Sequence, residues 1–322
     1  MKYNNKEFYK LLNILHKMMN VRNFLIAIFS ISCSWFSFGQ SNLLNAKSPS
    51  QIGIKTAAQL NSDNDKPLPY GYVHDRDVFM AKTTWELIDL DERINFPLYF
   101  PVDTANIGKE RRSLFQVLLN GVKSGRITEV YGDDYFNTKK SLKDMESVFV
   151  YVDTTDAGKD ELNNYYDDYK SGKRVLDPQY ISKTELAASD IVGYKIKGYW
   201  YFDTRLSELK YRLLAICPVA IEARDKAKGN EDPIELFWVF FPSIRNVLHE
   251  AKAFNEKNSA MPITFDHLLN SRRFNGVIYK EENVFGDRTI EDYMKENAQM
   301  QLLESERVKD KIRSFEQDMW NY

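Results

Sequence analysis

The fold is decided by residues 191–241, which open with the runs Val192-Gly193-Tyr194-Lys195-Ile196 and Tyr199-Trp200-Tyr201-Phe202. Both runs are rich in aromatic and β-branched residues, as β-strands commonly are. Two more strands are expected at Tyr211 to Val219 and at Ile234 to Phe241, joined by the charged turn Arg224–Asp232. The apolar run 236–241 is too short to span a bilayer, so we expect a core strand buried on both faces. The segment predicts an antiparallel sheet.

Amphipathic helices are expected before and after this sheet segment. Residues 78–93 carry Phe79, Trp85 and Ile88 at helical spacing among charged residues. A second helix should run through the apolar residues Leu114, Phe115, Leu118, Leu119 and Val122, with a capping box of Ser113 and Gln116 at its start. Residues 288–320 predict one amphipathic helix or two, packed on its own domain or bound to a partner. The predicted class is α+β, an antiparallel sheet with packed helices and a helical carboxyl terminus.

Two parts of the chain share an order of sequence features. The short aromatic stretch Phe96–Pro101 contains Leu98-Tyr99-Phe100-Pro101, which is similar to Val239-Phe240-Phe241-Pro242. Three further pairs follow in the same order: the helices 115–120 and 265–270, the strands Arg126–Tyr131 and Gly276–Tyr279, and the turns Tyr131-Gly132-Asp133 and Phe285-Gly286-Asp287. Such patterns are common, so chance and an internal duplication into two related halves are both open interpretations.

The remaining segments suggest the domain organisation. Residues 40–74 are rich in Ser, Asn, Gly and Pro and predict an extended or disordered arm, either a spacer or a segment that orders on a partner. A globular α+β region should follow from residue 75 to residue 322. Residues 152–190 are polar and acidic and predict a solvated loop, because their spacing does not fit a calcium loop. This segment would join two subdomains, 75–150 and 190–322.

The amino terminus has the three parts of a cleavable signal peptide, which together end at Gly39. Arg22 is the basic residue, residues 24–36 are the apolar run, and Ser37-Phe38-Gly39 is the cleavage site. A signal of ordinary length starts at Met18 or Met19, so residues 1–17 would precede the true start. A membrane anchor fits less well because serines interrupt the run, and lipidation of Cys33 fits less well because Ser30 stands where a lipobox carries Leu.

Composition limits the class of partner. Removing residues 1–39 leaves 39 basic and 45 acidic residues, a net charge of −6. A mildly acidic chain argues against nucleic acid, because it has no basic surplus to neutralise phosphates. Cys217 is then the one cysteine, so no disulfide can form within the chain, and its apolar neighbours predict a buried, inert thiol.

The mature sequence contains no recognisable catalytic or metal-binding pattern. His74, His249 and His267 have no zinc-site spacing, and the phosphate-binding, dinucleotide and nucleophile-elbow patterns are absent. The pair Asp133-Asp134 could serve a glycosidase, although a capped turn explains it more simply. We therefore expect no catalytic, cofactor-binding or metal-binding residues. A periplasmic enzyme acting on envelope carbohydrate or peptide is the alternative, because active sites can be assembled from distant residues.

Several stretches between about Asp75 and the carboxyl terminus resemble the gliding-motility protein N family (GldN, or PorN), a component of type IX secretion. They are Trp85-x-x-Ile88-Asp89-Leu90, Asn95-x-Pro97, Leu236-Phe237-Trp238, Phe241-Pro242, Thr264-Phe265-Asp266, Tyr279-Lys280-Glu281-x-Asn283, Leu302-Leu303-Glu304-Ser305-Glu306-Arg307 and Glu316-x-Asp318-Met319-Trp320. The carboxyl-terminal stretches are the most specific. A close paralogue within the same family would look almost identical.

The resemblance implies a periplasmic structural protein. It would assemble with an outer-membrane lipoprotein (GldK, or PorK) into large rings, and these would work with an inner-membrane motor in protein secretion and gliding. The family has no known catalytic residues, so the resemblance transfers none. Association with the outer membrane would come through the lipoprotein partner.

Overall fold

A computed structural model describes Ser48 and residues 66–107, 111–221, 223–228, 232–254, 263–295 and 297–320. The predicted signal peptide, its upstream extension 1–17, Cys33 and most of the predicted arm lie outside these residues. The last part of that arm, 66–74, lies within them and contacts the folded domain. There the ring of Tyr70 lies 4.6 Å from the guanidinium of Arg212 and 4.2 Å from that of Arg245. The predicted division into subdomains stays a prediction.

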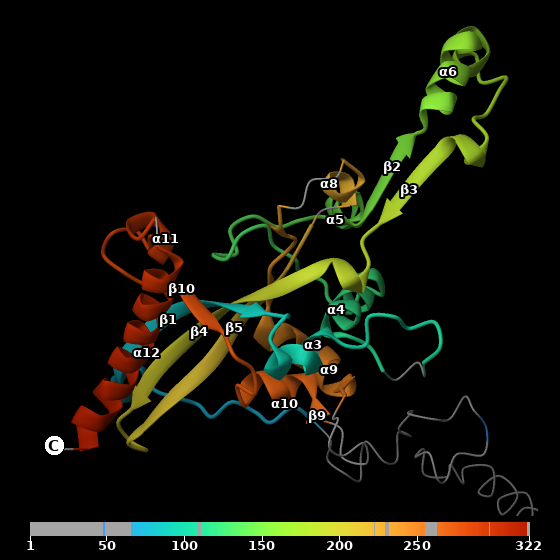
Figure 1. Ribbon diagram of the computed structural model, residues 1–322. Coiled ribbons are helices and arrows are strands. Elements are labelled where there is room, and N and C mark those ends of the chain that lie inside the picture. The colour runs from blue at the N-terminus through green and yellow to red at the C-terminus, as the bar shows by residue number, and fades with distance from the viewer. Residues whose placement is uncertain are drawn as a thin grey trace, which may run out of the picture. The chain divides into compact units, whose positions relative to one another are not determined.

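The centre of the fold is the long antiparallel hairpin of β4 (Ile191–Asp203) and β5 (Glu208–Ala220). β4 contains both aromatic runs of the opening segment, and β5 contains the strand expected at 211–219. Together they confirm the predicted antiparallel sheet. The sheet order is β10-β1-β4-β5-β6, with β7 also paired to β5 (Figure 1).

The helix predicted for residues 78–93 is wrong, because residues 78–89 form strand β1 (Val78–Asp89) between β4 and β10 (Val277–Glu281). Thr84, Trp85, Glu86 and Ile88 are all buried, so the strand is covered on both faces near its end. A strand buried on both faces has no polar alternation, and its apolar spacing can match that of a helix.

The single strand predicted for Ile234–Phe241 is also wrong. The chain forms two short strands, β6 (Ile234–Glu235) and β7 (Val239–Phe240), and helix α9 (Phe241–Glu250) then begins at once. Pro242 lies in the first turn of α9, where the missing N–H group of proline has no cost. The predicted burial is confirmed for Leu236 and Phe237.

Helices cover one face of the sheet and enclose the main core (Figure 1). They are α3 (Phe96–Tyr99), α4 (Leu114–Lys123), α5 (Leu142–Phe149), α9 and α10 (Phe265–Asn270). The short helix α8 (Ala223–Lys228) packs against α5 instead. The predicted cap of α4 is confirmed, since the Ser113 side chain accepts from the backbone N–H of Gln116. Core residues Ile88, Ile196 and Ile216 pack against these helices from the sheet.

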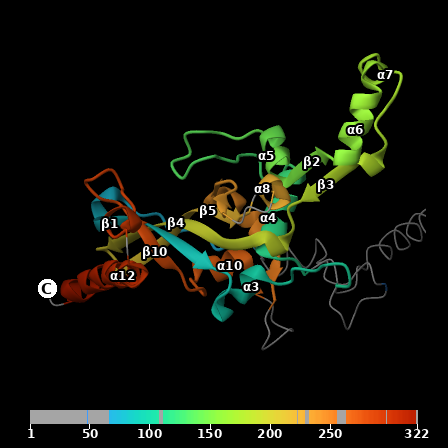
Figure 2. The ribbon, with the colours of Figure 1, turned by 45° about the horizontal axis from the view of Figure 1, so that its top comes forward.

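The carboxyl terminus forms two helices, α11 (Ile290–Tyr293) and the long α12 (Ala298–Trp320). α12 packs beside β10, at one edge of the sheet (Figure 2). Val308 and Ile312 form a small core with Ile278, and the Ser305 hydroxyl accepts a hydrogen bond from the Ile278 backbone N–H at 2.8 Å. α12 thus covers a strand edge that would otherwise expose its backbone groups.

The loop predicted for residues 152–190 is instead a hairpin with a helical tip. Strands β2 (Val150–Thr154) and β3 (Ile181–Glu185) pair antiparallel, and α6 (Asp156–Asn164) and α7 (Tyr166–Lys170) lie between them. The smaller elements of the chain are the 3-10 helices η2 (Asp75–Asp77), η3 (Arg93–Asn95), η4 (Pro178–Tyr180) and η5 (Ala188–Asp190), and the strands β8 (Lys252–Ala253) and β9 (Ile263–Thr264).

The structure agrees only in part with the order of features that suggested a duplication. The matched helices form as α4 and α10, and 276–279 contributes to β10. The strand predicted at Arg126–Tyr131 is wrong, because that stretch makes only isolated bridges at Tyr131. The aromatic-Pro pair that begins a helix in the first part is Phe96-Pro97, not Phe100-Pro101. The duplication stays a prediction, whereas the mixed α+β class is confirmed.

Candidate functional site

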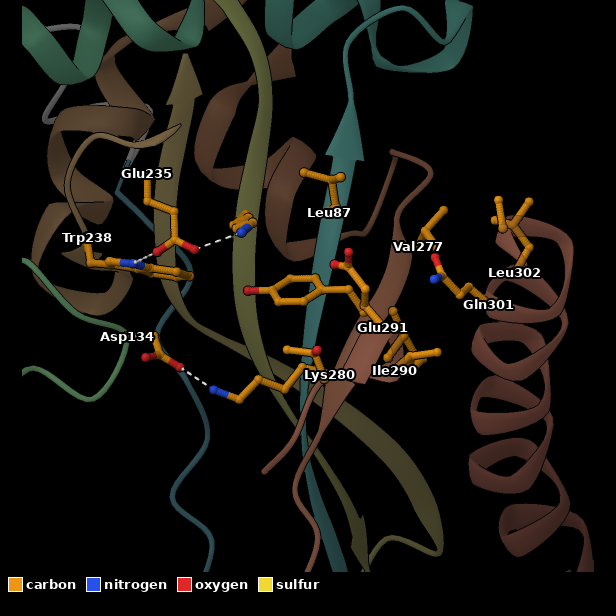
Figure 3. Close-up of a pocket in the computed structure, with 15 residues that line it drawn as sticks. Leu87, Asp134, Glu235, Trp238, Val277, Lys280, Ile290, Glu291, Gln301 and Leu302 are labelled. Atoms are coloured by element: carbon orange, nitrogen blue, oxygen red, sulfur yellow. Dashed lines mark hydrogen bonds and ion pairs between the residues drawn. The ribbon is translucent and has the colours of Figure 1, made fainter. Parts of the chain in front are cut away.

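A groove of about 580 Å³ lies on the sheet surface between β10, the segment 235–238 and the start of α12 (Figure 3). We call it the aromatic groove. Figure 3 shows Glu235, Trp238 and Asp134 on one side and Gln301 and Leu302 on the other. The remaining lining residues are Leu87, Lys195, Val277, Ile278, Tyr279, Lys280, Thr289, Ile290, Glu291 and Ala298.

The first side of the groove is held by a network around Glu235. One carboxylate oxygen of Glu235 lies 2.7 Å from the Lys195 ammonium, and the other accepts from the Trp238 indole N–H at 2.8 Å. The Lys195 ammonium also lies 4.9 Å from the centre of the Tyr279 ring. Burial raises the pKa of the Tyr279 hydroxyl, so it stays protonated at neutral pH. The network therefore holds the rings of Trp238 and Tyr279 in place around the Glu235 carboxylate, which is already paired with Lys195.

Two lysines share an aromatic cage beside this network. The Lys280 ammonium lies 4.2 Å from the Trp85 ring centre and that of Lys197 lies 4.8 Å from it, and both lysines contact the Tyr135 ring. Burial lowers the pKa of Lys197. Burial would also lower the pKa of Lys280, but its interactions with Asp134, including a hydrogen bond of 3.0 Å, and with Tyr135 together outweigh this and the pKa is raised. The cage fastens the loop of Asp134 and Tyr135 to the sheet.

Beside the groove, α12 exposes two leucines and buries the two polar residues that follow them. Leu302 and Leu303 are 52% and 63% exposed, whereas the next two residues, Glu304 and Ser305, are buried. Glu304 accepts hydrogen bonds from Arg307 and from the Tyr293 hydroxyl, and Ser305 caps β10. The buried polar side chains of Glu304 and Ser305 thus have hydrogen-bond partners, whereas the adjacent leucines are exposed to solvent. An exposed apolar pair beside a groove is typical of an interaction surface.

The residues weighed as candidates for chemistry do not converge. His74 precedes η2, His249 lies on α9 and His267 lies on α10. Across the residues that the structure describes, no three His, Cys, Asp or Glu side chains are grouped so as to hold a metal ion. Cys217 is buried, which raises the pKa of its thiol and confirms the predicted inert cysteine.

The pair Asp133-Asp134 lies in a capped turn, which is the simpler of the two interpretations of this pair. The Asp133 carboxylate accepts from the backbone N–H groups of Asn137 and Thr138 at 3.0 and 2.7 Å, and these hydrogen bonds lower its pKa. Asp134 pairs with Lys280 instead of facing its neighbour. Both carboxylates serve the local structure.

Several residues of the site were not singled out from the sequence. Lys197 and Tyr135 meet Trp85 through contacts between segments more than 40 residues apart, which no local pattern encodes. One weak signal existed, because Lys195 and Lys197 alternate along an otherwise aromatic strand and therefore share a sheet face.

A model of the family described as gliding motility associated protein GldN matches residues 73–321. The chain belongs to the GldN family. No curated protein matches it at a significant level. Membership implies a role in gliding motility and type IX secretion, and the GldN family is not a known enzyme family.

In this GldN-family chain, the stretches that carry the resemblance meet at the aromatic groove. Trp85 lies in the cage beside it, and Trp238, Lys280 and Leu302 line it. These four residues come from four separate stretches of the sequence. No helix in the described part of the chain is both long and apolar enough to cross a membrane.

Proposed function

We propose that this chain is a periplasmic structural subunit of the type IX secretion and gliding machinery. It assembles with an outer-membrane lipoprotein of the GldK or PorK type into a ring that supports protein secretion and gliding, and it acts with the inner-membrane motor indirectly. The observation that carries the proposal is the family match over residues 73–321. The signal peptide expected at residues 1–39 would bring the chain to the periplasm, and the lipoprotein would hold it at the outer membrane.

The aromatic groove supports a role in binding a protein partner. Two of its three carboxylates, Glu235 and Asp134, are held in ion pairs, so these two are engaged in the structure rather than presented to a substrate. Leu302 lines the groove, Leu303 is the next residue on α12, and both are exposed to solvent. Fixed aromatic side chains with an apolar rim resemble the centre of a protein interface, where aromatic residues contribute most of the binding energy. We assign this groove to the lipoprotein.

A ring places a second demand on the surface of the subunit. Subunits that close into a ring must contact one another through two different faces, because a self-complementary face yields only a dimer. A ring subunit that also binds a lipoprotein therefore needs a third surface. The groove is one surface, which leaves the contacts between subunits to other parts of the chain.

The groove assignment predicts the outcome of replacing its exposed leucines. In Leu302→Asp/Leu303→Asp, two charges enter an apolar contact, so capture of the lipoprotein should fall by tenfold or more, about 1.4 kcal/mol or above. The measurement is co-purification of the lipoprotein with the tagged chain from cells. Folding should persist because both side chains are exposed, as thermal unfolding would verify.

Leu206→Asp is the matched control, since Leu206 is a similarly exposed leucine at the turn between β4 and β5. It should leave capture unchanged. Full capture by the double variant would contradict the assignment of the groove. Loss of capture in both variants would show that the effect is not specific to α12.

A further inference from the structure

The hairpin of β2, α6, α7 and β3, residues 150–185, exposes most of its side chains. We call it the acidic hairpin. Its base contacts α5 and α8, and Figures 1 and 2 both show α6 at the opposite end, away from α4. Tyr166 and Val175 are 60% and 87% exposed. Apolar and aromatic side chains on an element that adds little to its own core point to a partner.

The charge of the acidic hairpin narrows the choice of partner. From Asp153 to Asp177 the chain holds seven acidic residues and four basic ones. Some acids are satisfied locally, such as Asp156 by Lys159 and Glu161 by Arg174. The tip therefore combines exposed tyrosines with an excess of negative charge. A surface complementary to it would be concave, with an apolar floor and a basic rim.

The same chain carries such a surface between α4 and α9. We call it the basic groove, a hollow of about 430 Å³ with Val117 and Val247 at its floor. Its rim carries Arg112, Arg126 and Lys252 against one acid, Glu250, which pairs with Arg126 at 2.7 Å. Arginine at a rim suits both carboxylates and tyrosine rings, since its planar guanidinium binds the first and stacks on the second.

We propose that the acidic hairpin of one copy of this chain docks in the basic groove of the next copy. This inference rests on the proposed function and names the contact between ring subunits. The two surfaces differ and lie on different elements, so the contact is head-to-tail. Such a contact leaves a free hairpin at one end of every dimer and a free groove at the other, so that copies add until the ring closes. It leaves the aromatic groove open for the lipoprotein.

Cysteine pairing tests the contact directly, because the mature chain contains only the buried Cys217. Asn164, at the end of α6, and Asn120, on α4 in the basic groove, are both exposed. A chain with both Asn164→Cys and Asn120→Cys, made in cells with its envelope partners and treated with a mild oxidant, should give a ladder of covalent oligomers. Mixing the two single variants should give a dimer containing one of each.

The control pairs Asn164→Cys with Asn137→Cys, an exposed asparagine outside the basic groove, and should give no ladder. High-mass complexes without the predicted ladder would overturn this inference and leave the proposed function standing. A chain that stays monomeric in cells would overturn both.

Charge reversal offers a second test that does not depend on oxidation. Asp167→Lys/Asp168→Lys should weaken self-association by about tenfold at low salt, because like charges would then meet at the rim. Combining the hairpin and groove substitutions in one chain, as Asp167→Lys/Asp168→Lys/Arg112→Glu/Arg126→Glu, should restore self-association, because every contact then pairs opposite charges again. If the fourfold variant self-associates no better than the hairpin variant or the Arg112→Glu/Arg126→Glu variant alone, the proposed contact is contradicted.

Discussion

Arg272 is half-buried and joins distant parts of the chain through the buried carboxylate of Glu86. Its guanidinium makes two hydrogen bonds, of 3.0 and 2.7 Å, to the carboxylate of Glu86 on β1. The rings of Tyr211 and Trp200 lie 4.2 and 5.0 Å from it. Arg272 also has a positive φ of 50°, a conformation that costs energy for a residue with a side chain. We therefore expect the pair of Arg272 and Glu86 to contribute strongly to the stability of the domain.

At the residue scale, Arg272→Ala should destabilise the domain by about 3–5 kcal/mol, because Glu86 would be left charged and unpaired in the interior. The measurement is the free energy of unfolding in urea. Arg126→Ala is the control, since its pair with Glu250 is exposed on both sides and should contribute about 0–1 kcal/mol. If the two substitutions lowered the free energy of unfolding equally, the claim that the buried ion pair contributes more than the exposed one would be wrong.

Single residues were predicted well where their environment is local. The Ser113 cap and the capped turn at Asp133 depend on neighbours a few residues away, and the apolar residues next to Cys217 in the sequence indicated its burial. The pair of Glu86 and Arg272 depends on residues 186 positions apart. Nothing in either stretch marks that pairing, because each residue alone resembles an ordinary surface charge.

At the scale of elements, the edge strand β10 depends on α12. The Ser305 hydroxyl satisfies the buried backbone N–H of Ile278, and the strand lies between α12 and β1. Ser305→Ala should leave that N–H group unsatisfied, at a cost of about 1–3 kcal/mol. Amide hydrogen exchange at Ile278 should be faster, and the urea midpoint should fall.

Ser314→Ala on the same helix is the control, since Ser314 is exposed. It should change neither measurement. Unaltered exchange at Ile278 in Ser305→Ala would mean that α12 does not hold the edge through this hydroxyl.

Elements were predicted correctly where their composition or periodicity was distinctive and wrongly where it was ambiguous. β4, β5 and α4 follow clear patterns, and the structure confirms them. β1 is covered on both faces, so its apolar residues mimic a helix. The acidic hairpin was missed because its strands expose most of their side chains and lack an apolar face.

At the scale of the whole molecule, the aromatic groove could not have been predicted from composition or motifs. Its lining combines residues from 87 to 302, brought together by the order β10-β1-β4-β5. The family resemblance identified several of these residues beforehand, without indicating that they share one surface. The two proposals together give the chain separate surfaces for a lipoprotein, for the preceding subunit and for the following one.

The central claim is that this chain works as an assembled subunit of the cell envelope. The most direct test is the mass and composition of the native complex recovered with the tagged wild-type chain from gently solubilised envelopes. We predict a high-mass assembly that contains many copies of the chain together with an outer-membrane lipoprotein. Recovery of a monomer with no envelope partner would contradict the account.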